Sequence, residues 1–404
     1  MTISIKNDLD EFIITNWLKI NAYIDTKMEG KEIPFYTSVD IRESREKYAP
    51  VDNNLYPAGF NNLCLLDLDA TTKQIEKFIP ESKKSIAILI ESNTKNKFYL
   101  ENIFFLKKAI EESDKQVTLI SFDQSLFENN STILKLETAS MFQLSIHQAY
   151  FKDNHIFAEG IDENFDLVII NHDQSSAINI DWSVNQTPSS PNPQMGWFNR
   201  QKIIHFQAYE KVVHDFCEHF DIDENLLQAK FKKVYDVDFS SKNGFEKLAN
   251  EVDRLKETIS SNQKIFIKAS KGTYGMGIQV VDSGSDILNL NRKKRNKLDI
   301  GKNKIKFTDV LVQEGIETVL NYDEMPAEIT IYLVGGKSVG GFMRTNNQKS
   351  ASDNLNTKGM IFKKFCISEI RQNRDDVMKE AVYSIIGRLS CLASIEETRM
   401  TLEN

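Results

Sequence analysis

The sequence contains few of the residues and patterns that mark specialised classes of protein. Of its 404 residues, 8 are proline and 17 are glycine, while 41% are hydrophobic and 27% are charged. This composition excludes collagen-like, coiled-coil and fully disordered chains. No apolar run approaches the roughly 20 residues that a membrane helix needs. The first residues, MTISIKNDLDEF, include acids and lack the apolar core of a signal peptide. We therefore expect a cytoplasmic protein with no membrane partner.

Cysteine is also scarce, and neither sign of charge dominates strongly. The four cysteines (Cys64, Cys217, Cys366 and Cys391) form no C-x-x-C motif, so we expect no zinc site and four free thiols. The 50 basic and 58 acidic residues give a net charge of -8, which argues against nucleic acid as a partner. A basic run at 292–306 lacks interleaved aromatic residues and is interpreted as a solvated loop.

The sequence does contain an alternation of strand and helix patterns in its first half. Short apolar, β-branched runs at 84–92, 116–122 and 165–173 indicate strands, and an amphipathic pattern at 99–113 indicates a helix. This order favours an open parallel sheet. Ligands of such sheets bind beyond the carboxyl ends of the strands. The polar residues at the end of the third run are Asn171, Asp173, Ser175 and Ser176.

A segment rich in proline, serine and asparagine at 181–198 is the best candidate for a domain boundary. We predict an α/β protein with an N-terminal open parallel sheet and a second domain after it. The predicted domains are 1–190, which would bind the substrate, and 191–404. The second domain would comprise a helical or lid part at about 197–260, a nucleotide core at about 261–365 and helices at 367–404.

The strongest local motif is Lys268 followed by KGTYGMG at 271–277. Its three glycines let backbone N–H groups approach phosphate oxygens closely, and Lys268 can add positive charge. A strand pattern follows the motif, whereas a P-loop or a Rossmann glycine motif opens a helix. The simpler alternative is a glycine-rich hairpin turn. The candidate phosphate-binding residues are Lys268, Lys271, Gly272, Thr273, Tyr274, Gly275, Met276 and Gly277.

Further polar residues follow in an order that suits a nucleotide. The strand ending in Gln313, Glu314 and Gly315 can offer backbone groups to adenine and a carboxylate to ribose. Arg344 suits a phosphoryl group or an acyl phosphate. Taken singly, each of these residues could be a solvated polar side chain. Hard oxygen ligands for Mg²⁺ are offered by Glu328, Asn354 and Asn356.

Residues 33–62 are rich in Pro, Gly, Asn and Asp, and we predict a loop after a short strand at 35–41. The segment carries charges of both signs and several amides. An amino acid substrate needs this mixture, with cations for its carboxylate and anions for its ammonium. The bland alternative is a capped surface loop. The candidate substrate-binding residues here are Ser38, Asp40, Arg42, Lys47, Asp52, Asn54, Asn61 and Asn62.

The order of motifs over 260–365 resembles the ATP-grasp superfamily. Two further segments are more specific: SVDIR with KYAPVDNNLYPAGFNNL at 38–63, and GWFNRQKIIHF at 196–206. Together they resemble the proteobacterial glutamate–cysteine ligases of the ATP-grasp type, over most of the chain. One departure is Gly335, since many ATP-grasp enzymes place an Asp in the corresponding turn. Glu328 or Asn354 would then replace that Asp as a metal ligand.

The resemblance implies an N-terminal sheet like the one that precedes ATP-grasp domains. It also implies ATP-dependent ligation of L-glutamate and L-cysteine to γ-glutamylcysteine through a γ-glutamyl phosphate, the first step of glutathione biosynthesis. ATP and Mg²⁺ would be required, with Lys268 and Arg344 catalytic and Arg200 added to the substrate-binding set. The alternatives are an ATP-grasp ligase for other amino acids and a noncatalytic nucleotide-binding protein. The sequence leaves a homo-oligomer open.

Overall fold

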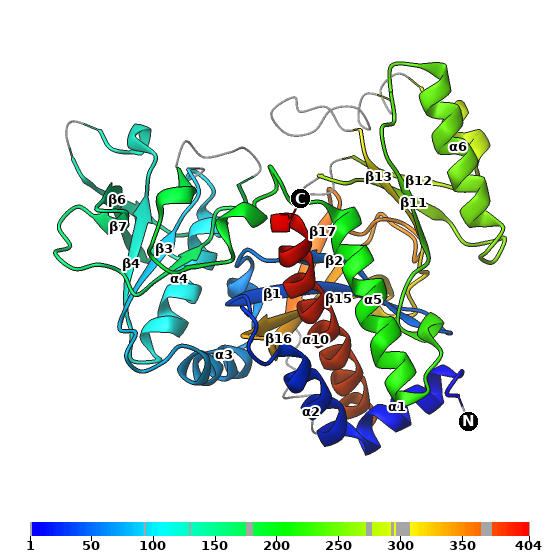
Figure 1. The fold of residues 1–404 in the computed structure, drawn as a ribbon, viewed down its shortest axis with the longest axis horizontal. Coiled ribbons are helices and arrows are strands. Elements are labelled where there is room, and N and C mark those ends of the chain that lie inside the picture. The colour runs from blue at the N-terminus through cyan, green and yellow to red at the C-terminus, as the bar shows by residue number, and fades with distance from the viewer. Residues whose placement is uncertain are drawn as a thin grey trace.

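The computed structural model describes residues 2–92, 94–128, 131–174, 181–271, 277–291, 295, 308–364 and 374–403. Within this part of the chain the strands form three sheets. Helices cover the sheets, and two long helices run side by side through the middle of the molecule (Figure 1). The fold is therefore a mixed α/β fold, as the alternation of strand and helix patterns predicts.

The first sheet contains the predicted parallel strands. β3 (Ser85–Leu89) pairs in parallel with β4 (Gln116–Ser121) and with β8 (Leu167–Ile170), which confirms parallel pairing of the predicted strands. The whole sheet is mixed, because β6 pairs antiparallel with β5 and β7. Its strand order is β5-β6-β4-β3-β8-β9, with β7 paired to β6. The helices α3 (Leu65–Phe78) and α4 (Lys97–Glu111) pack beside it. Its remaining strands are β5 (Ile133–Glu137), β6 (Gln143–Lys152), β7 (His155–Ala158) and β9 (Ser189–Ser190).

The second sheet is antiparallel and joins distant parts of the chain in the order β17-β16-β15-β1-β2, with β14 paired to β15. Gly335 and Gly336 form the turn of the predicted hairpin, with φ values of +54° and +73° that favour glycine. The strands are β1 (Tyr36–Glu43), β2 (Tyr48–Asn54), β14 (Asn321–Tyr322), β15 (Met325–Val334), β16 (Lys337–Asn346) and β17 (Met360–Lys364).

The prediction that residues 42–54 form a loop is wrong, because they complete a hairpin of β1 and β2. The composition of β2, YAPVDNN, concealed the strand. Pro50 cannot donate a ladder hydrogen bond, yet it lies on an edge strand opposite Ile41, where the register shifts. Edge strands and bulges are the places in a sheet that tolerate proline.

The third sheet is small and antiparallel, with the order β10-β13-β11-β12. The apolar side of α6 (Lys242–Lys256) covers one face of it. The predicted strands on either side of the glycine motif are β11 (Ile265–Ala269) and β12 (Ile278–Val281), whereas residues 272–276 lie outside the described part. Its other elements are β10 (Phe231–Val234), β13 (Val310–Glu314) and the short helix α7 (Gly284–Leu288).

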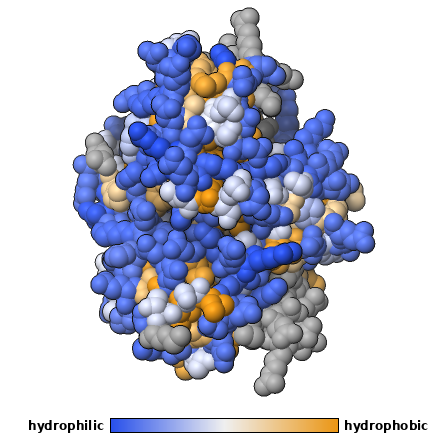
Figure 2. Space-filling model, turned by 90° about the vertical axis from the view of Figure 1, so that its right-hand side faces the viewer, coloured by the Kyte–Doolittle hydropathy of each residue, from blue (hydrophilic) through white to orange (hydrophobic). Residues whose placement is uncertain are grey.

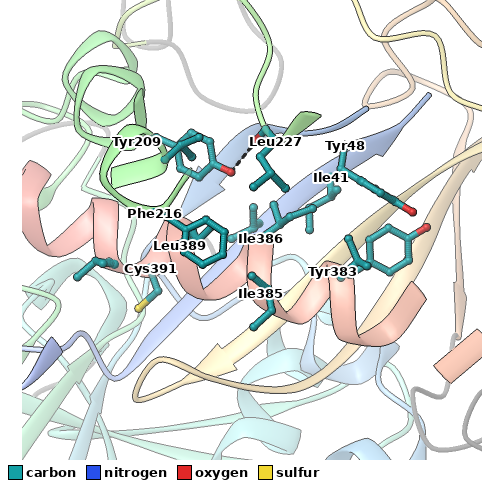
Figure 3. Close-up of a cluster of buried hydrophobic side chains, with 14 of the residues drawn as sticks. Ile41, Tyr48, Tyr209, Phe216, Leu227, Tyr383, Ile385, Ile386, Leu389 and Cys391 are labelled. Atoms are coloured by element: carbon teal, nitrogen blue, oxygen red, sulfur yellow. Dashed lines mark hydrogen bonds between the residues drawn. The ribbon is translucent and has the colours of Figure 1, made fainter. Parts of the chain in front are cut away.

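A helical layer covers the second sheet and supplies the largest apolar core. Figure 3 shows side chains of α5 (Lys202–Phe220) and α10 (Arg374–Glu403) packed with Ile41 and Tyr48 of the β1–β2 hairpin. The helix predicted at 8–28 is two helices, α1 (Lys6–Thr15) and α2 (Trp17–Met28), and both add to this core. Short 3-10 helices connect the elements: η1 (Phe60–Asn62), η2 (Gln124–Leu126), η3 (Trp182–Val184), η4 (Pro193–Met195) and η5 (Glu224–Leu226).

The predicted boundary near residue 190 does not separate the sheets. β1 lies before that boundary and β15 after it, yet Tyr36–Ile41 pairs with Val334–Ile329 in one continuous ladder. The reason is that strand pairing depends on contacts between residues about 290 positions apart, which no local composition reveals. The predicted substrate segment and the hairpin with Glu328 and Arg344 therefore share one sheet.

The cysteines differ from the expectation. Cys64 at the N-terminus of α3 is disulfide-bonded, so the expectation of four free thiols is wrong, while Cys217 and Cys391 are free. Sequence spacing could not indicate this bond, because none of the cysteines are near neighbours in the sequence.

Hydrophilic residues cover most of the face in Figure 2. None of the helices in the described part is long and apolar enough to cross a membrane.

Candidate active site

A polar pocket lies between the second sheet and the third. One wall comes from β1, β2, β15 and β16, and the opposite wall comes from β11, β12 and β13. The segment that follows β16 closes one side of the pocket with Asn354 and Asn356. The predicted site residues that line it are Asp40, Arg42, Asp52, Lys268, Gln313, Glu314, Glu328, Arg344, Asn354 and Asn356.

The alternation of side chains along β11 explains how the third sheet faces the pocket. Ile265 and Ile267 point into the apolar core against α6, whereas Phe266 and Lys268 line the pocket. Successive side chains of a strand point to opposite faces, so this alternation follows directly from the sequence IFIKA. The strand therefore places Lys268 in the pocket, beside the apolar side chain of Phe266.

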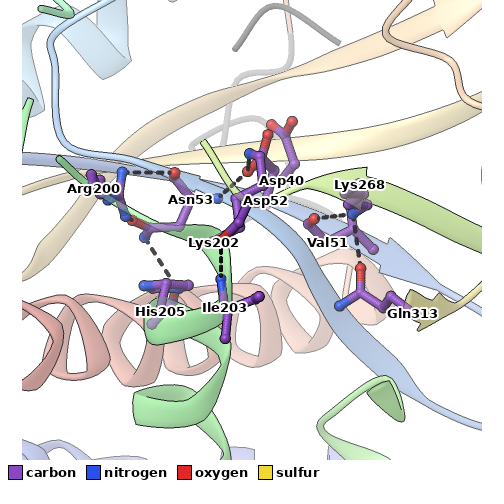
Figure 4. Close-up of polar contacts among 12 residues, drawn as sticks. Asp40, Val51, Asp52, Asn53, Arg200, Lys202, Ile203, His205, Lys268 and Gln313 are labelled. Atoms are coloured by element: carbon purple, nitrogen blue, oxygen red, sulfur yellow. Dashed lines mark hydrogen bonds and ion pairs between the residues drawn. The ribbon is translucent and has the colours of Figure 1, made fainter. Parts of the chain in front are cut away.

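Lys268 is buried, with 6% of its surface exposed. Its Nζ donates to the carbonyl of Val51, at 2.6 Å, and to Oε1 of Gln313, at 2.8 Å (Figure 4). Burial, together with the nearby cations Lys202 and Arg42, lowers its pKa to about 8, against the opposing effect of Asp52. A dehydrated ammonium of this kind can bind a phosphate or carboxylate strongly.

Arg344 lies on the opposite wall of the pocket. Its Nη1 lies 2.7 Å from Oδ2 of Asp40 and 2.7 Å from Oε1 of Glu328. Glu328 is the register partner of Arg344 on the neighbouring strand. Burial alone would raise the pKa of Glu328, but Arg42 and Arg344 together lower it, so Glu328 is ionised. For Asp40, burial outweighs the attraction of Arg344 and raises the pKa.

Two buried donors of the pocket lack an acceptor among the described residues. They are Nε of Arg344 and Nε2 of Gln313. A buried donor without a partner costs free energy, about 1–3 kcal/mol for each group. A ligand with acceptor oxygens would satisfy both, so the pocket is suited to an anionic small molecule.

Three predicted cations form buried ion pairs with the protein. Arg42 lines the pocket, but its Nε donates to Glu328 and its Nη1 and Nη2 donate to backbone carbonyls, among them that of Asp353 at 2.6 Å. Nζ of Lys47 lies 3.0 Å from both carboxylate oxygens of Glu314. Arg42 and Lys47 are thus committed to structural contacts in this arrangement.

Arg200 is the third of these cations and lies outside the residues that line the pocket in the described part. Its guanidinium donates to Glu397 and to the backbone and side chain of Asn53, and it stacks over the ring of Trp197. It joins the start of α5 to β2 and α10 (Figure 4). This geometry indicates a structural clamp.

The remaining predicted residues lie elsewhere. Nζ of Lys271 donates to the carbonyl of Phe198 at 3.2 Å. Gly277 adopts a φ of +70° next to β12, and the amide of Gly315 donates to the carbonyl of Lys264. Gly272 to Met276 lie outside the described residues. The described lining of the pocket also excludes Ser38, Asn54, Asn61 and Asn62.

Lys202 was missed as a site residue by reasoning from sequence. Its Nζ lies 2.5 Å from Oδ1 of Asp52, which lines the pocket. Burial would raise the pKa of Asp52, but Lys202 and Lys268 lower it below the usual value. The signal was present, since Lys202 belongs to the GWFNRQK stretch, but that stretch supplied only Arg200 to the predicted set.

A metal site formed by the protein alone is not evident. In the part of the chain that the structure describes, no group of three or more His, Cys, Asp or Glu side chains is placed to hold a metal ion. Both oxygens of Glu328 accept from arginines, and Oδ1 of Asn354 accepts from the amide of Asn356. The turn at Gly335 lies at the far end of β15 from Glu328, roughly 20 Å away at the rise of a strand.

The structure is thus a mixed α/β protein with a pocket that is lined by buried side chains of both charges. The sequence model of the glutamate-cysteine ligase family matches residues 10–398, and the chain belongs to this family. It is therefore a ligase that joins glutamate to cysteine in the first step of glutathione biosynthesis. Its substrates are small molecules, and ATP drives the ligation in the family.

One known structure that covers nearly the whole chain agrees with this membership. A protein from Methylobacillus flagellatus KT, assigned as a gamma-glutamylcysteine synthetase, is 28% identical, with a TM-score of 0.86 over 98% of this chain and 96% of that chain. A glutathione synthetase-like effector from Globodera pallida is 10% identical, with a TM-score of 0.43 and coverage of 86% and 81%. D-alanyl-alanine synthetase A from Vibrio cholerae is 11% identical, with a TM-score of 0.39 and coverage of 75% and 81%. No curated protein matches the sequence.

Proposed function

We propose that the pocket between the second and third sheets is the active site, where ATP phosphorylates the γ-carboxylate of glutamate and cysteine then attacks. The single observation that carries this proposal is the pair of unpartnered buried donors on opposite walls, Gln313 Nε2 and Arg344 Nε, in the described part of the pocket. Such donors suit a ligand with many acceptor oxygens.

The chemistry requires activation, because a carboxylate is unreactive toward an amine in water. In the proposed reaction the oxygen of the γ-carboxylate attacks the γ-phosphorus of ATP, and the bond to ADP breaks. The amine of cysteine then attacks the carbonyl carbon, inorganic phosphate leaves and the amine loses a proton. The product is an amide, with ADP and phosphate, and no covalent bond to the protein forms.

Each wall has a proposed role. Lys268, dehydrated by the apolar residues beside it, neutralises phosphate charge and holds the nucleotide against Gln313. Arg344 stabilises the charge that develops on the phosphoryl group and on the carbonyl oxygen. Arg344 is held in place for this task by Asp40 and Glu328, both 2.7 Å from its Nη1.

We propose that Mg²⁺ enters with ATP. A magnesium ion on phosphate oxygens needs only one or two further protein ligands, and oxygen ligands of the pocket wall fit this need: Glu328, Asn354 and Asn356. The ion would neutralise charge on the phosphates. The pairing of Glu328 with two arginines means that its carboxylate would have to be shared with the ion.

The arrangement also supports our proposal of an ATP-grasp organisation. Lys268 and the glycine motif belong to a small antiparallel sheet that faces a second antiparallel sheet across the pocket. Residues predicted from this resemblance, far apart in the sequence, line that one pocket. The parallel sheet with residues 85–170 would be the domain that precedes it.

The test is phosphate release measured with ATP, Mg²⁺ and every single and paired combination of amino acids. We expect turnover only when glutamate and cysteine, or an amine-bearing analogue of cysteine, are both present, with γ-glutamylcysteine as the product. The Arg344→Gln variant should reduce turnover severely while binding of ATP persists. Turnover that neither amino acid stimulates, or activity with an unrelated pair, would refute the proposed reaction.

A further inference from the structure

A second group of unpartnered polar side chains lies at the carboxyl edge of the parallel sheet, away from the lining of the pocket. Tyr56 Oη, Asn171 Oδ1 and both amide atoms of Gln174 are buried and have no hydrogen-bond partner in the part of the chain that the structure describes. The three residues are 2%, 2% and 0% exposed. Native proteins rarely leave such groups unsatisfied, so their presence together suggests a ligand.

These three residues are neighbours in the fold. Asn171 follows β8 directly, and its Nδ2 donates to the carbonyl of Pro57, next to Tyr56. The ring of Tyr56 packs in one apolar cluster with Ile170 and Met195. Gln174 lies against the residue after Met195, because a Cβ atom on Gly196 would come within 2.6 Å of the Cβ of Gln174.

The backbone of Gln174 is held in an unfavourable conformation. Its φ is +49°, in the left-handed region that non-glycine residues rarely adopt. Three hydrogen bonds keep it there: its amide donates to Nδ1 of His172, the amide of Phe198 donates to its carbonyl, and the amide of Trp197 donates to the carbonyl of Asp173. Strain of this kind persists where a side chain must be aimed, and it is typical of functional sites.

The segment at 196–202 connects this edge of the sheet to the active site. The carbonyl of Phe198, whose amide holds Gln174, accepts from Nζ of Lys271 in the glycine motif. Lys202, a few residues on, pairs with Asp52 of the pocket. The edge is thus one short segment away from both the phosphate-binding residues and the wall of the pocket.

The chemistry of the three side chains indicates which ligand they take. All are uncharged and offer both donors and acceptors. An amine that attacks a carbonyl must be neutral, and a carboxylate partner would instead stabilise its ammonium form. Amide oxygens also accept N–H groups, but, having no net charge, they favour the ammonium form less than a carboxylate does. The carboxylate of Asp173 has interactions of its own and is not counted among these groups.

We infer that Tyr56, Asn171 and Gln174 form the subsite for the amino acid whose amine attacks, namely cysteine. This inference rests on the proposed function, because it names the place of the second substrate in the same reaction. In this subsite Asn171 Oδ1 and Gln174 Oε1 accept from the amine, while Gln174 Nε2 and the Tyr56 hydroxyl donate to the carboxylate of cysteine.

The test uses Tyr56→Phe and Gln174→Met in the full chain. We expect each to raise the KM for cysteine about tenfold, as the loss of one hydrogen bond to a charged group would, and to leave the KM for glutamate and for ATP within about twofold. The melting temperature should stay equal or rise, because the atoms removed have no partner in the described protein. If Tyr56 and Gln174 had a merely structural role, these substitutions would lower the melting temperature.

The matched control is Tyr209→Phe. Tyr209 is also a buried tyrosine, but its hydroxyl donates to the carbonyl of Leu227 at 2.9 Å. This variant should lower the melting temperature and leave the KM for cysteine unchanged. An unchanged KM for cysteine in both test variants, or a rise in the KM for glutamate alone, would overturn the inference while the wild-type reaction still stands.

A direct binding measurement separates this result from a failure of the proposed reaction. Calorimetric titration of cysteine into the wild type and the two variants needs no turnover. Weaker binding of cysteine in Tyr56→Phe and Gln174→Met supports the subsite even if wild-type enzyme fails to release phosphate. Equal binding in all three proteins, or no binding to the wild type, refutes it.

Discussion

Nε of Arg42 donates to Oε2 of Glu328 at a distance of 2.8 Å. The two residues are 286 positions apart in the sequence but lie on the neighbouring strands β1 and β15. Both side chains are buried, at 3% exposed each. Removing one partner of a buried ion pair costs about 3–5 kcal/mol, because the other charge is left uncompensated. We therefore predict that Arg42→Ala lowers the free energy of unfolding by this amount, measured by denaturant titration.

Arg42→Lys should restore little of this loss. The guanidinium of Arg42 donates from all three of its nitrogens, and a lysine cannot reproduce such planar geometry. Arg399→Ala is the control, because Arg399 also pairs with glutamates but is half exposed, and it should leave the free energy of unfolding nearly unchanged. If Arg42→Ala raised only the KM for an amino acid and left stability intact, direct substrate binding by Arg42 would be favoured instead.

Lys268→Met should weaken binding of ATP without destabilising the protein. Loss of a hydrogen bond to a charged phosphate costs about 1.5–3 kcal/mol, or roughly 10- to 150-fold in affinity. The buried ammonium itself is unfavourable at neutral pH, since its pKa is lowered to about 8. Its removal should leave the free energy of unfolding equal or higher by up to about 3 kcal/mol. A lower melting temperature with unchanged ATP affinity would make Lys268 a structural residue.

The lowered pKa of Lys268 predicts that its effect on the stability of the protein depends on pH. In the folded protein its pKa is about 8, whereas an unfolded lysine titrates near 10.4. The unfavourable effect of its charge on stability is therefore fully present below pH 8 and diminishes as the pH rises from 8 toward 10.4. The stability difference between Lys268→Met and the wild type should shrink over that range, and a constant difference would contradict the lowered pKa.

The sequence predicted the parts of the fold that rest on local pattern. The apolar runs that became β3, β4 and β8, and the glycines at the turn of the β15–β16 hairpin, carry their structure within a few residues. The pairing of β1 with β15 was not predictable in this way, since it joins residues whose local sequences carry no information about each other. The strand β2 was missed for a different reason, since its local sequence YAPVDNN has the composition of a loop.

The candidate site shows the same division. Residue type and order indicated Lys268, Gln313, Glu328 and Arg344 as candidates, and the structure brings these residues to one pocket, while their chemical roles stay predictions. The sequence did not show which groups of the protein pair with the predicted cationic residues. Glu397, which binds Arg200, lies 197 positions from it on the last helix. Charge alone cannot distinguish a substrate-binding arginine from one that holds two elements together.

The turn between β15 and β16 gives a prediction about Gly335. Its φ is +54°, and a Cβ atom there would lie 2.2 Å from the ring of Phe78. Gly335→Asp should therefore lower the free energy of unfolding by roughly 1–3 kcal/mol or more, from backbone strain and the clash. A variant with wild-type stability in denaturant titration would show that the turn can accommodate the Asp common in ATP-grasp enzymes.

The last prediction concerns Glu397, which is fully buried on α10. Its oxygens accept from Nε of Arg200 at 2.7 Å and from Nδ1 of His205 at 2.9 Å. Burial alone would raise its pKa, but Arg200 and His205 lower it to about 2. Glu397→Gln should cost about 3–5 kcal/mol of stability at neutral pH, because Arg200 is left buried without its counter-charge.

The sign of the pH effect follows from the lowered pKa. An unfolded Glu titrates near 4.3, so the stability that Glu397 contributes is present above that pH and is lost as the pH falls toward 2. The gap between wild type and Glu397→Gln should narrow from pH 4.5 to pH 2. The neighbouring Glu396→Gln is the control, since Glu396 pairs with the more exposed Arg399 and Lys211 and should change stability by less than about 1 kcal/mol. A gap between wild type and Glu397→Gln that stays constant down to pH 2 would show that Glu397 acts through packing, and not through its charge on Arg200.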